Sequence, residues 1–459
     1  MILINPPWNT KYPQPPLGLA SLAAVIENSG HQIKILDANA LCISKEKVAD
    51  LVKREEIIGL TAMTPIVNSA IGMARMIKQE NPDSKIILGG PHATNHPTDI
   101  LRNVKEIDII VRGEGEATIV ELLEKLEKNR LNEVRGISYR NESRIIENPS
   151  RPLIIDLDSL PFLAYHLLPI SKYKLHPPHG RRSPVMAMLT SRGCPYNCVF
   201  CSKSVFGSNW RGQSPKRILE EISYIKEKFR IKEIVFYDDS FTLKRKRIFE
   251  LAEEIKNRNM DMPWTCETRV NLVDLEMLSA MKSAGCYMIA YGIESGDPSI
   301  LATLRKNITK EQIESAVEMT QKVGIQSIGY FMIGSPGETN ATIRKTIDFA
   351  KNLSLDFAQF SVTIPFPGTD LYNVYFDKLD KNILWDDFIY ARIGSAGTPV
   401  FESKELSKGQ LKNWNKIAYG EFYLRFSYIW KRFIKMRSAG DFKTNLIGLR
   451  MFLDMRGEK

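Results

Sequence analysis

The stretch SRGCPYNCVFCS, residues 191–202, contains Cys194, Cys198 and Cys201 in the spacing CxxxCxxC. No fourth cysteine or histidine lies close enough in the sequence to complete a structural zinc site, which takes four protein ligands. Three thiolates can instead hold three irons of a 4Fe-4S cube and leave the fourth iron open to a ligand that is not protein. The spacing therefore predicts a 4Fe-4S cluster with one open iron.

The region around this stretch, residues 183–395, alternates strand-like apolar runs with amphipathic helical stretches. Six such runs occur, and the three cysteines follow the first of them, VMAMLT. Six βα units are too few to close an eightfold barrel, so we predict a partial (β/α)6 barrel of the TIM type. Active-site residues of such barrels lie at the carboxyl ends of the strands, which is where the cysteine loop is expected.

Residues 1–128 also alternate uninterrupted apolar runs with helical stretches, which predicts an α/β domain with a doubly wound, Rossmann-like parallel sheet. Ligands of such sheets bind beyond the carboxyl ends of the strands. The candidate ligand-binding residues at these ends are Asn5, Pro6, Thr61, Thr64, Gly89, Gly90, Gly113 and Glu114. No GxGxxG follows the first strand, which disfavours a nicotinamide cofactor. Residues 129–182 are interpreted as a connector with a hairpin.

Composition places the chain among ordinary globular proteins, with 459 residues, 43% hydrophobic and 25% charged. Six cysteines are too few for a disulfide framework, and the chain starts with MILINPPW rather than a basic segment and an apolar run. We therefore expect a reducing, cytoplasmic location. No apolar run approaches the roughly 18 residues of a membrane-spanning helix.

The excess positive charge gathers in the carboxyl-terminal region, residues 396–459, which is predicted to be helical. Positions 401–459 hold 13 Lys and Arg residues against 6 Asp and Glu residues, a net charge of +7 out of +10. Aromatic residues recur there at helical spacing at Tyr419, Phe422, Phe426, Trp430 and Phe433. Basic residues interleave with them at Lys416, Arg425, Lys431, Arg432, Lys435 and Arg437.

Two interpretations of this region stay open. A basic amphipathic helix is typical of peripheral contact with an anionic membrane. Alternatively, the aromatic stripe packs on the barrel while the charges are solvated. Nucleic-acid binding is disfavoured because no recognised binding module accompanies the charge.

The motifs of residues 1 to about 400 resemble one family. RGC and the aromatic residue before the third cysteine resemble the signature of radical S-adenosylmethionine (SAM) enzymes. VFYDDSFT, WTCETRVN, YGIESGD and GYFMIGSPGET resemble the strand-end motifs of that family's barrel, in family order. INPPW, PPLGLASLAA, ILGGPHAT and VRGEGEAT resemble the cobalamin-binding domain of its largest subgroup, the class B methylase-like enzymes.

This resemblance implies a chemistry and a set of SAM contacts. The open iron would chelate SAM, and an electron from a donor such as flavodoxin or ferredoxin would release a 5'-deoxyadenosyl radical. The implied SAM-binding residues are Asp238 or Asp239 for the methionine ammonium group, Arg269 for its carboxylate, Glu294 for the ribose or methionine, and Gly334 and Gly337 for the adenine. Because YDD stands where many relatives carry Gly-Gly-Glu, the sequence leaves open which aspartate makes the contact. No catalytic side chain is assigned.

The subgroup further implies cobalamin and methylation of an unactivated carbon. The Asp-x-His-x-x-Gly motif of many cobalamin proteins is absent, and members of the subgroup commonly bind cobalamin without a histidine on cobalt. The tail resembles those of relatives that modify lipid or isoprenoid-like substrates, so we expect a hydrophobic substrate.

Three alternatives remain. One is radical cyclisation, oxidation or carbon-carbon coupling of a lipid, tetrapyrrole or natural product, with or without cobalamin. Another is a methylthiotransferase, although such enzymes carry three more cysteines in the amino-terminal domain, where this chain has only Cys42. The last is an iron-sulfur or nucleic-acid-binding protein without catalysis, which leaves YDD, Arg269 and GIESG unexplained.

Overall fold

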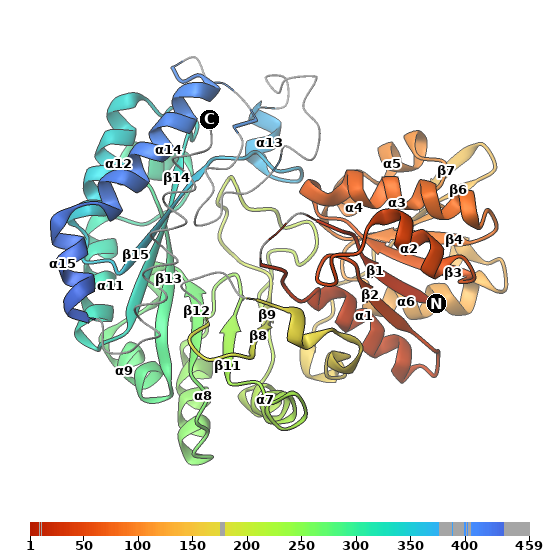
Figure 1. The fold of residues 1–459 in the computed structure, drawn as a ribbon, viewed down its shortest axis with the longest axis horizontal. Coiled ribbons are helices and arrows are strands. Elements are labelled where there is room, and N and C mark those ends of the chain that lie inside the picture. The colour runs from red at the N-terminus through yellow and green to blue at the C-terminus, as the bar shows by residue number, and fades with distance from the viewer. Residues whose placement is uncertain are drawn as a thin grey trace.

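The computed structural model describes residues 1–435 apart from positions 9 and 11 and the ranges 175–179, 376–387, 389–398, 401 and 403–404. Two α/β bodies lie side by side (Figure 1). The first is built on a seven-stranded sheet near the amino terminus, and the second is built on a curved six-stranded sheet. The predicted order of a doubly wound domain followed by a partial barrel is confirmed.

The amino-terminal sheet has the strand order β2-β1-β3-β4-β5-β6-β7. Its five parallel strands are β1 (Ile2–Asn5), β2 (Lys34–Asp37), β3 (Ile57–Thr61), β4 (Lys85–Gly89) and β5 (Ile109–Val111). One face packs on α1 (Leu17–Asn28) and α6 (Glu116–Leu126). The other packs on α2 (Lys45–Val52), α3 (Val67–Glu80) and α5 (Pro97–Asn103). The short α4 (Pro91–Asn95) follows β4. Both faces are thus covered, as the uninterrupted apolar strands require.

The hairpin that the sequence placed in the connector belongs to this sheet instead. Its strands β6 (Ile137–Asn141) and β7 (Arg144–Glu147) pair antiparallel, and β6 pairs antiparallel with β5. The hairpin supplies hydrogen-bond partners to β5, which would otherwise be an open edge. The sheet therefore extends to Glu147, beyond the expected boundary near residue 128.

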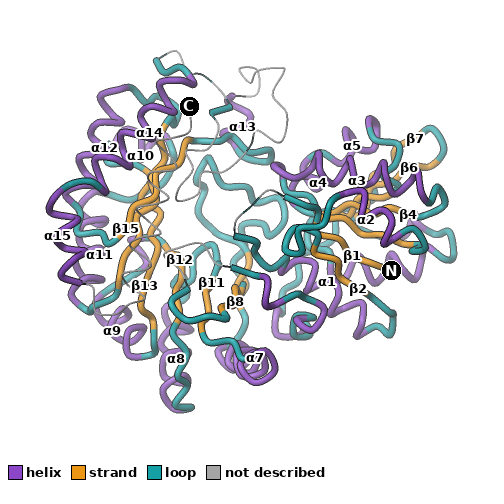
Figure 2. The backbone as a smooth tube through the Cα atoms, viewed as in Figure 1, coloured by secondary structure: helices purple, strands orange, loops and turns teal. Residues whose placement is uncertain are grey.

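The second sheet is parallel throughout and has the order β8-β11-β12-β13-β14-β15. Its strands are β8 (Val185–Met188), β11 (Glu233–Phe236), β12 (Trp264–Thr268), β13 (Cys286–Glu294), β14 (Gln326–Ile333) and β15 (Phe357–Val362). The helices between them are α7 (Pro215–Phe229), α8 (Arg245–Asn257), α9 (Leu275–Ser283), α10 (Pro298–Thr303), α11 (Lys310–Lys322) and α12 (Asn340–Asn352). Most of these helices cover the outer side of the curved sheet (Figure 2). The largest apolar core lies between strands and helices.

The carboxyl-terminal helices close the open edge of this sheet. They are α14 (Lys408–Tyr423) and α15 (Phe426–Lys435), where the sequence suggested one continuous stripe. The hydroxyl of Tyr423 contacts both the N–H and the carbonyl of Ala358 on β15, at 3.0 and 2.7 Å. Asn415 Nδ2 donates to the carbonyl of Phe360 at 2.8 Å. Side chains thus satisfy backbone groups that an edge strand leaves unpaired.

One part of the aromatic stripe therefore fits packing on the barrel, and another part fits a surface helix. Tyr419 and Phe422 are buried against the barrel, whereas Phe426 and Trp430 are 78% and 55% exposed. The side chains of Lys431, Arg432, Phe433 and Lys435 lie outside the described part of the structure, as does Arg437. Within the described residues, no helix is long and apolar enough to cross a membrane.

The connector packs on the barrel through a buried carboxylate. Glu221 on α7 accepts a hydrogen bond from the hydroxyl of Tyr165 at 2.9 Å and lies 3.3 Å from the guanidinium of Arg217. Burial raises the pKa of Glu221, while Arg217 and Tyr165 act in the opposite direction. Each of these partners offsets part of the cost of burying the charge.

We expect the substitution Tyr165→Phe to lower the free energy of unfolding by about 1–3 kcal/mol, because it removes a hydrogen bond from a buried carboxylate. Urea unfolding measures the change. The matched control is Tyr224→Phe on α7, for which the structure gives no hydrogen bond of the hydroxyl. Equal stability of the two variants would contradict this role.

Candidate active site

The cysteine loop begins directly after the first barrel strand. β9 (Ser191–Arg192) pairs antiparallel with β10 (Arg211–Gly212), and Gly193 follows with φ of +83°. A side chain at Gly193 would collide with the carbonyl oxygen of Asn209. Glycine is therefore required for the chain to turn into the loop at this point.

The three thiols of the loop differ in exposure, with Cys198 buried, Cys194 half-buried and Cys201 exposed. The N–H of Cys201 donates to the carbonyl of Cys198 at 3.2 Å, and the Arg269 guanidinium lies 3.4 Å from the Cys198 sulfur. A hydrogen bond from the Cys201 thiol and the positive charges of Lys306 and Arg269 lower the pKa of Cys198 to about 6. A thiolate is the form that binds iron, so this environment favours ligation by Cys198, whereas the hydrogen bond to Cys198 raises the pKa of Cys201.

The donor set of the loop fits the predicted cluster. It offers three thiols at the carboxyl end of a barrel strand beside two cations, which suits a cluster that is negatively charged with its thiolates. Within the described residues, no group of three or more His, Cys, Asp or Glu side chains is arranged to hold a single metal ion. The residues that would hold the cluster are Cys194, Cys198 and Cys201.

The two aspartates after β11 have different surroundings. The Asp238 carboxylate is buried and accepts hydrogen bonds from the N–H and hydroxyl of Thr190 and from the hydroxyl of Ser191, at 2.7 to 2.9 Å. Asp239 keeps contact with solvent, but the surrounding protein removes part of its hydration, and this desolvation together with the nearby Asp238 raises its pKa. Asp238 thus anchors the start of the cysteine loop, which leaves Asp239 as the more accessible of the two carboxylates.

Arg269 and Glu294 both lie beside the cysteine loop. The Arg269 guanidinium stacks 3.8 Å from the ring centre of Tyr196 and donates to the carbonyl of Lys306. Glu294 at the end of β13 accepts from Lys306 Nζ at 2.8 Å, and both side chains are less than 10% exposed. Lys306 was not identified from the sequence, because nothing in its local pattern distinguishes it from a solvated lysine.

The two glycines after β14 have different neighbours. Gly334 has φ of +89°, and a side chain there would lie 2.8 Å from Leu411 on α14. Gly337 has φ of +78° and open space where a side chain would stand. Glu338 stabilises the turn, because its carboxylate accepts hydrogen bonds from the N–H groups of Gly334 and Ser335 at 2.5 and 2.9 Å. Gly337 is thus the position at which a ligand has room to approach the backbone.

A carboxylate and a phenol meet on the inner side of the barrel, and the sequence interpretation missed both. The Tyr330 hydroxyl on β14 donates to Glu267 on β12 at 3.0 Å. Burial and the nearby Asp239 and Asp238 raise the pKa of Glu267 to about 7, although Tyr330 lowers it. The signal was present, because Cys266 lies in the core with the helices and its neighbour Glu267 must face the opposite side of the strand.

The candidate cobalamin residues all lie at the carboxyl ends of the amino-terminal strands, but several are engaged in other contacts. Asn5 Nδ2 donates to Asp37 at 2.9 Å, and Thr64 Oγ1 lies 3.2 Å from His92 Nδ1. A side chain at Gly90 would lie 2.7 Å from the carbonyl oxygen of Ala62, so this glycine is needed for packing. Pro6 is buried. These four residues therefore make structural contacts at the edge of the sheet.

Three other candidates are accessible at this edge. Thr61 and Gly89 are half-buried at adjacent strand ends, and Gly113 has φ of +71° with open space at its missing side chain. Glu114, in contrast, is buried and ion-paired with Arg192 and Arg211 from the barrel. It joins the domains rather than presenting a free carboxylate.

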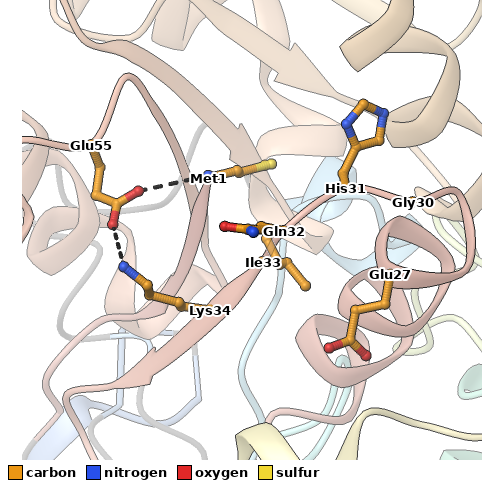
Figure 3. A pocket seen from close by; sticks show the side chains of 8 residues that line it. All are labelled: Met1, Glu27, Gly30, His31, Gln32, Ile33, Lys34 and Glu55. Carbon is orange, nitrogen blue, oxygen red and sulfur yellow. Dashed lines mark hydrogen bonds and ion pairs between the residues drawn. The ribbon is translucent and has the colours of Figure 1, made fainter.

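A cavity of about 500 Å³ lies elsewhere, at the amino ends of β1 and β2. Glu27, His31, Lys34 and Glu55 are among its lining residues, and Glu55 pairs with Lys34 and with the amino group of Met1 (Figure 3). This position is opposite the edge where ligands of parallel sheets bind.

Glu267 gives a prediction for the pH dependence of stability. Its pKa of about 7 in the folded state exceeds the ordinary 4.5. Between those values the unfolded chain releases a proton that the folded chain keeps, so stability falls as pH rises through this window. The substitution Glu267→Gln should remove the contribution of this carboxyl group to the loss of stability with rising pH. Thermal unfolding at pH 5 and pH 8 measures it, with the exposed Glu253→Gln as control. Parallel pH profiles for native protein and Glu267→Gln would refute the assignment.

Family comparisons agree with both domains. The model described as "Radical SAM superfamily" matches residues 188–350, and "B12 binding domain" matches residues 9–123. An uncharacterized methyltransferase of Pyrococcus horikoshii is 39% identical over 90% of this chain and 88% of its own length. An anaerobic magnesium-protoporphyrin IX monomethyl ester cyclase of Rubrivivax gelatinosus is 28% identical over 92% of this chain and 76% of its own.

A hopanoid C-3 methylase of Methylococcus capsulatus is 28% identical over 78% of this chain and 68% of its own. Among solved structures, the cobalamin-dependent SAM radical enzyme OxsB superposes over 99% of this chain and 71% of its own, with a TM-score of 0.77 at 18% identity, which shows the same fold. The chain therefore belongs to the radical SAM enzymes with a B12-binding domain, whose cofactors are a 4Fe-4S cluster, SAM and cobalamin.

Proposed function

We propose that this enzyme methylates an unactivated carbon of a substrate with a large apolar part. The observation that carries the proposal is the direct contact between the cysteine loop and the cobalamin-side sheet edge, through Arg192 and Glu114 at 2.9 Å. When bound, the cluster and SAM supply a 5'-deoxyadenosyl radical and cobalamin supplies a methyl group. The relatives named methyltransferase and methylase support this reaction.

The side chains of the barrel mouth take the following roles in the proposal. Cys194, Cys198 and Cys201 hold the cluster. Asp239 receives the methionine ammonium group of SAM in a charge-assisted hydrogen bond, because the oxygens of Asp238 are already occupied. Arg269 pairs with the methionine carboxylate from its position beside Cys198.

The remaining SAM contacts come from the neighbouring strands. Glu294, oriented by Lys306, receives the ribose or the methionine group. The backbone at Gly334 and Gly337 accepts the adenine, with Gly337 the more open of the two. On the cobalamin side, we propose contact at Thr61, Gly89 and Gly113, which stay accessible at the strand ends.

The inner side of the barrel supports an apolar substrate. Met288, Ala290 and Ile328 form a cluster separate from the core that packs on the helices. Glu267 and Tyr330 add one polar position, which suits a substrate with a single hydroxyl or amine on an apolar body. The hopanoid methylase relative supports the lipid class.

The second candidate reaction is radical cyclisation, favoured by one specific observation. The cyclase of Rubrivivax gelatinosus aligns with 92% of this chain. In that case the deoxyadenosyl radical would still form, but no methyl group would enter the product. Both reactions need a reductant, for which we propose flavodoxin or ferredoxin in the cytoplasm.

Methyl-labelled SAM separates the two reactions. Anaerobically reconstituted enzyme with a lipid extract should release 5'-deoxyadenosine and transfer the label to a lipid. Changing Cys194, Cys198 and Cys201 together to alanine should abolish both, while the exposed Cys42→Ala retains both. Release of 5'-deoxyadenosine with an unlabelled new product would support cyclisation. A full cluster in the triple variant would contradict the cysteine assignment.

We further propose that α15 contacts an anionic membrane from the cytoplasmic side. Its exposed apolar side chains, Phe426, Ile429, Trp430 and Ile434, recur at helical spacing on one face. Arg425 is excluded from this contact, because it donates to the carbonyl of Lys351 on the barrel and stacks on Phe422.

Binding to vesicles containing phosphatidylglycerol should therefore fall in the variant Phe426→Ser and Ile429→Ser, because apolar area inserts below the headgroups. Sedimentation at low and high salt measures it. Ile155→Ser removes an equally exposed apolar side chain from the connector and should leave binding unchanged. Equal binding of both variants would remove the membrane contact from the proposal.

A further inference from the structure

Charged side chains from both domains form a buried bridge beside the cysteine loop. Arg192, two positions before Cys194, donates from Nη1 to Glu114 at 2.9 Å and from Nη2 to Glu116 at 2.6 Å. The side-chain exposures of Arg192, Glu114 and Glu116 are 11%, 3% and 7%. Both glutamates follow β5 at the carboxyl edge of the amino-terminal sheet.

A second arginine completes the bridge. Arg211, which lies opposite Arg192 in the β9–β10 ladder, donates to both oxygens of Glu114 at 2.8 and 2.9 Å. The N–H of Ile154 donates to Glu114 at 2.7 Å, and Ser21 Oγ donates to Glu116 at 2.7 Å. Two arginines and two glutamates leave the bridge without net charge, and each carboxylate has several donors.

The bridge is connected to the cysteine loop through a tight turn and a shared backbone carbonyl. Gly193, between Arg192 and Cys194, is confined by the carbonyl oxygens of Asn209 and Phe206. Arg211 also donates to the carbonyl of Phe206 at 2.7 Å, so the bridge and the turn share a backbone group. On the other side, Glu114 lies next to Gly113, whose missing side chain faces open space. One short path of contacts therefore connects the cobalamin-side edge with the first cluster cysteine.

We propose that Glu114 and Glu116 are positioning residues that, through Arg192, set the placement of the cluster loop relative to the cobalamin site. This proposal rests on the cofactors of the family and does not depend on the methylation proposed above. A carboxylate of the amino-terminal domain then influences a cluster held entirely by the barrel. A role confined to stabilising one domain would leave the cluster unaffected.

The test uses the full-length, cluster-reconstituted protein with Glu114→Gln and hydroxocobalamin as the probe. The substitution leaves Arg211 without its counter-charge and Arg192 with Glu116 alone, so we expect hydroxocobalamin affinity to fall by roughly tenfold or more. The electron paramagnetic resonance spectrum of the reduced cluster should also change, with iron and sulfide content retained. Glu121→Gln on α6, which pairs with Arg151, is the matched control and should leave both readouts unchanged.

Unchanged affinity and an unchanged spectrum in folded Glu114→Gln would overturn the proposal, as would a change in affinity without a change in the spectrum. Where that variant does not fold, Arg192→Lys keeps the charge but loses the two-pronged donor geometry, and the same readouts decide. Neither readout requires substrate or product. Failure of this proposal is therefore distinguishable from failure of the proposed methylation.

Discussion

The parallel strands of the two sheets of this enzyme meet at their carboxyl ends across a buried set of opposite charges, and the arrangement of the active site depends on that contact. Arg192 leaves the barrel directly after its first strand, and Glu114 leaves the amino-terminal sheet directly after its fifth. Ligands of parallel sheets bind beyond these ends, so both binding edges face the same region. An ion pair with little solvent access keeps its geometry only while every partner is present.

Basic and acidic side chains occupy different parts of the barrel. Lys306 and Arg269 lie near Cys198 and favour its thiolate, whereas Asp238 and Asp239 follow β11 and Glu267 lies on β12. Hydrogen bonds from Thr190 and Ser191 and the nearby charge of Arg247 offset part of the burial of Asp238, while Asp239 is exposed and Glu267 is half-buried. Two cations thus lie beside Cys198, and acceptors lie toward the space where SAM and substrate are expected.

The carboxyl-terminal helices combine two properties that one sequence pattern suggested separately. Tyr423 and Asn415 of α14 satisfy the edge of β15, which also protects the sheet from pairing with another chain. The next helix, α15, then turns its apolar residues outward. A single aromatic stripe therefore serves as core at Tyr419 and Phe422 and as surface at Phe426 and Trp430.

The sequence by itself determined the fold class and the cofactors, and it predicts the three cysteines as the cluster ligands. Apolar runs and their order are local properties, and the three cysteines are close in sequence, so neither depends on distant contacts. The division between Asp238 and Asp239 was decided only by tertiary structure, because it depends on where Thr190 and Ser191 lie. The same holds for Lys306 at Glu294, and for Tyr330 on β14 reaching Glu267 on β12 past the intervening strand β13.

Glu114 shows this limit most clearly. At the end of β5 it matched the position of a ligand-binding residue, and only the packing of the two domains revealed Arg192 and Arg211 as its partners. The pattern of a strand end identifies which residues reach the edge of a sheet. Which of them stay free for a ligand depends on the groups that long-range folding brings there, and those groups are separated from Glu114 by dozens of positions in the sequence.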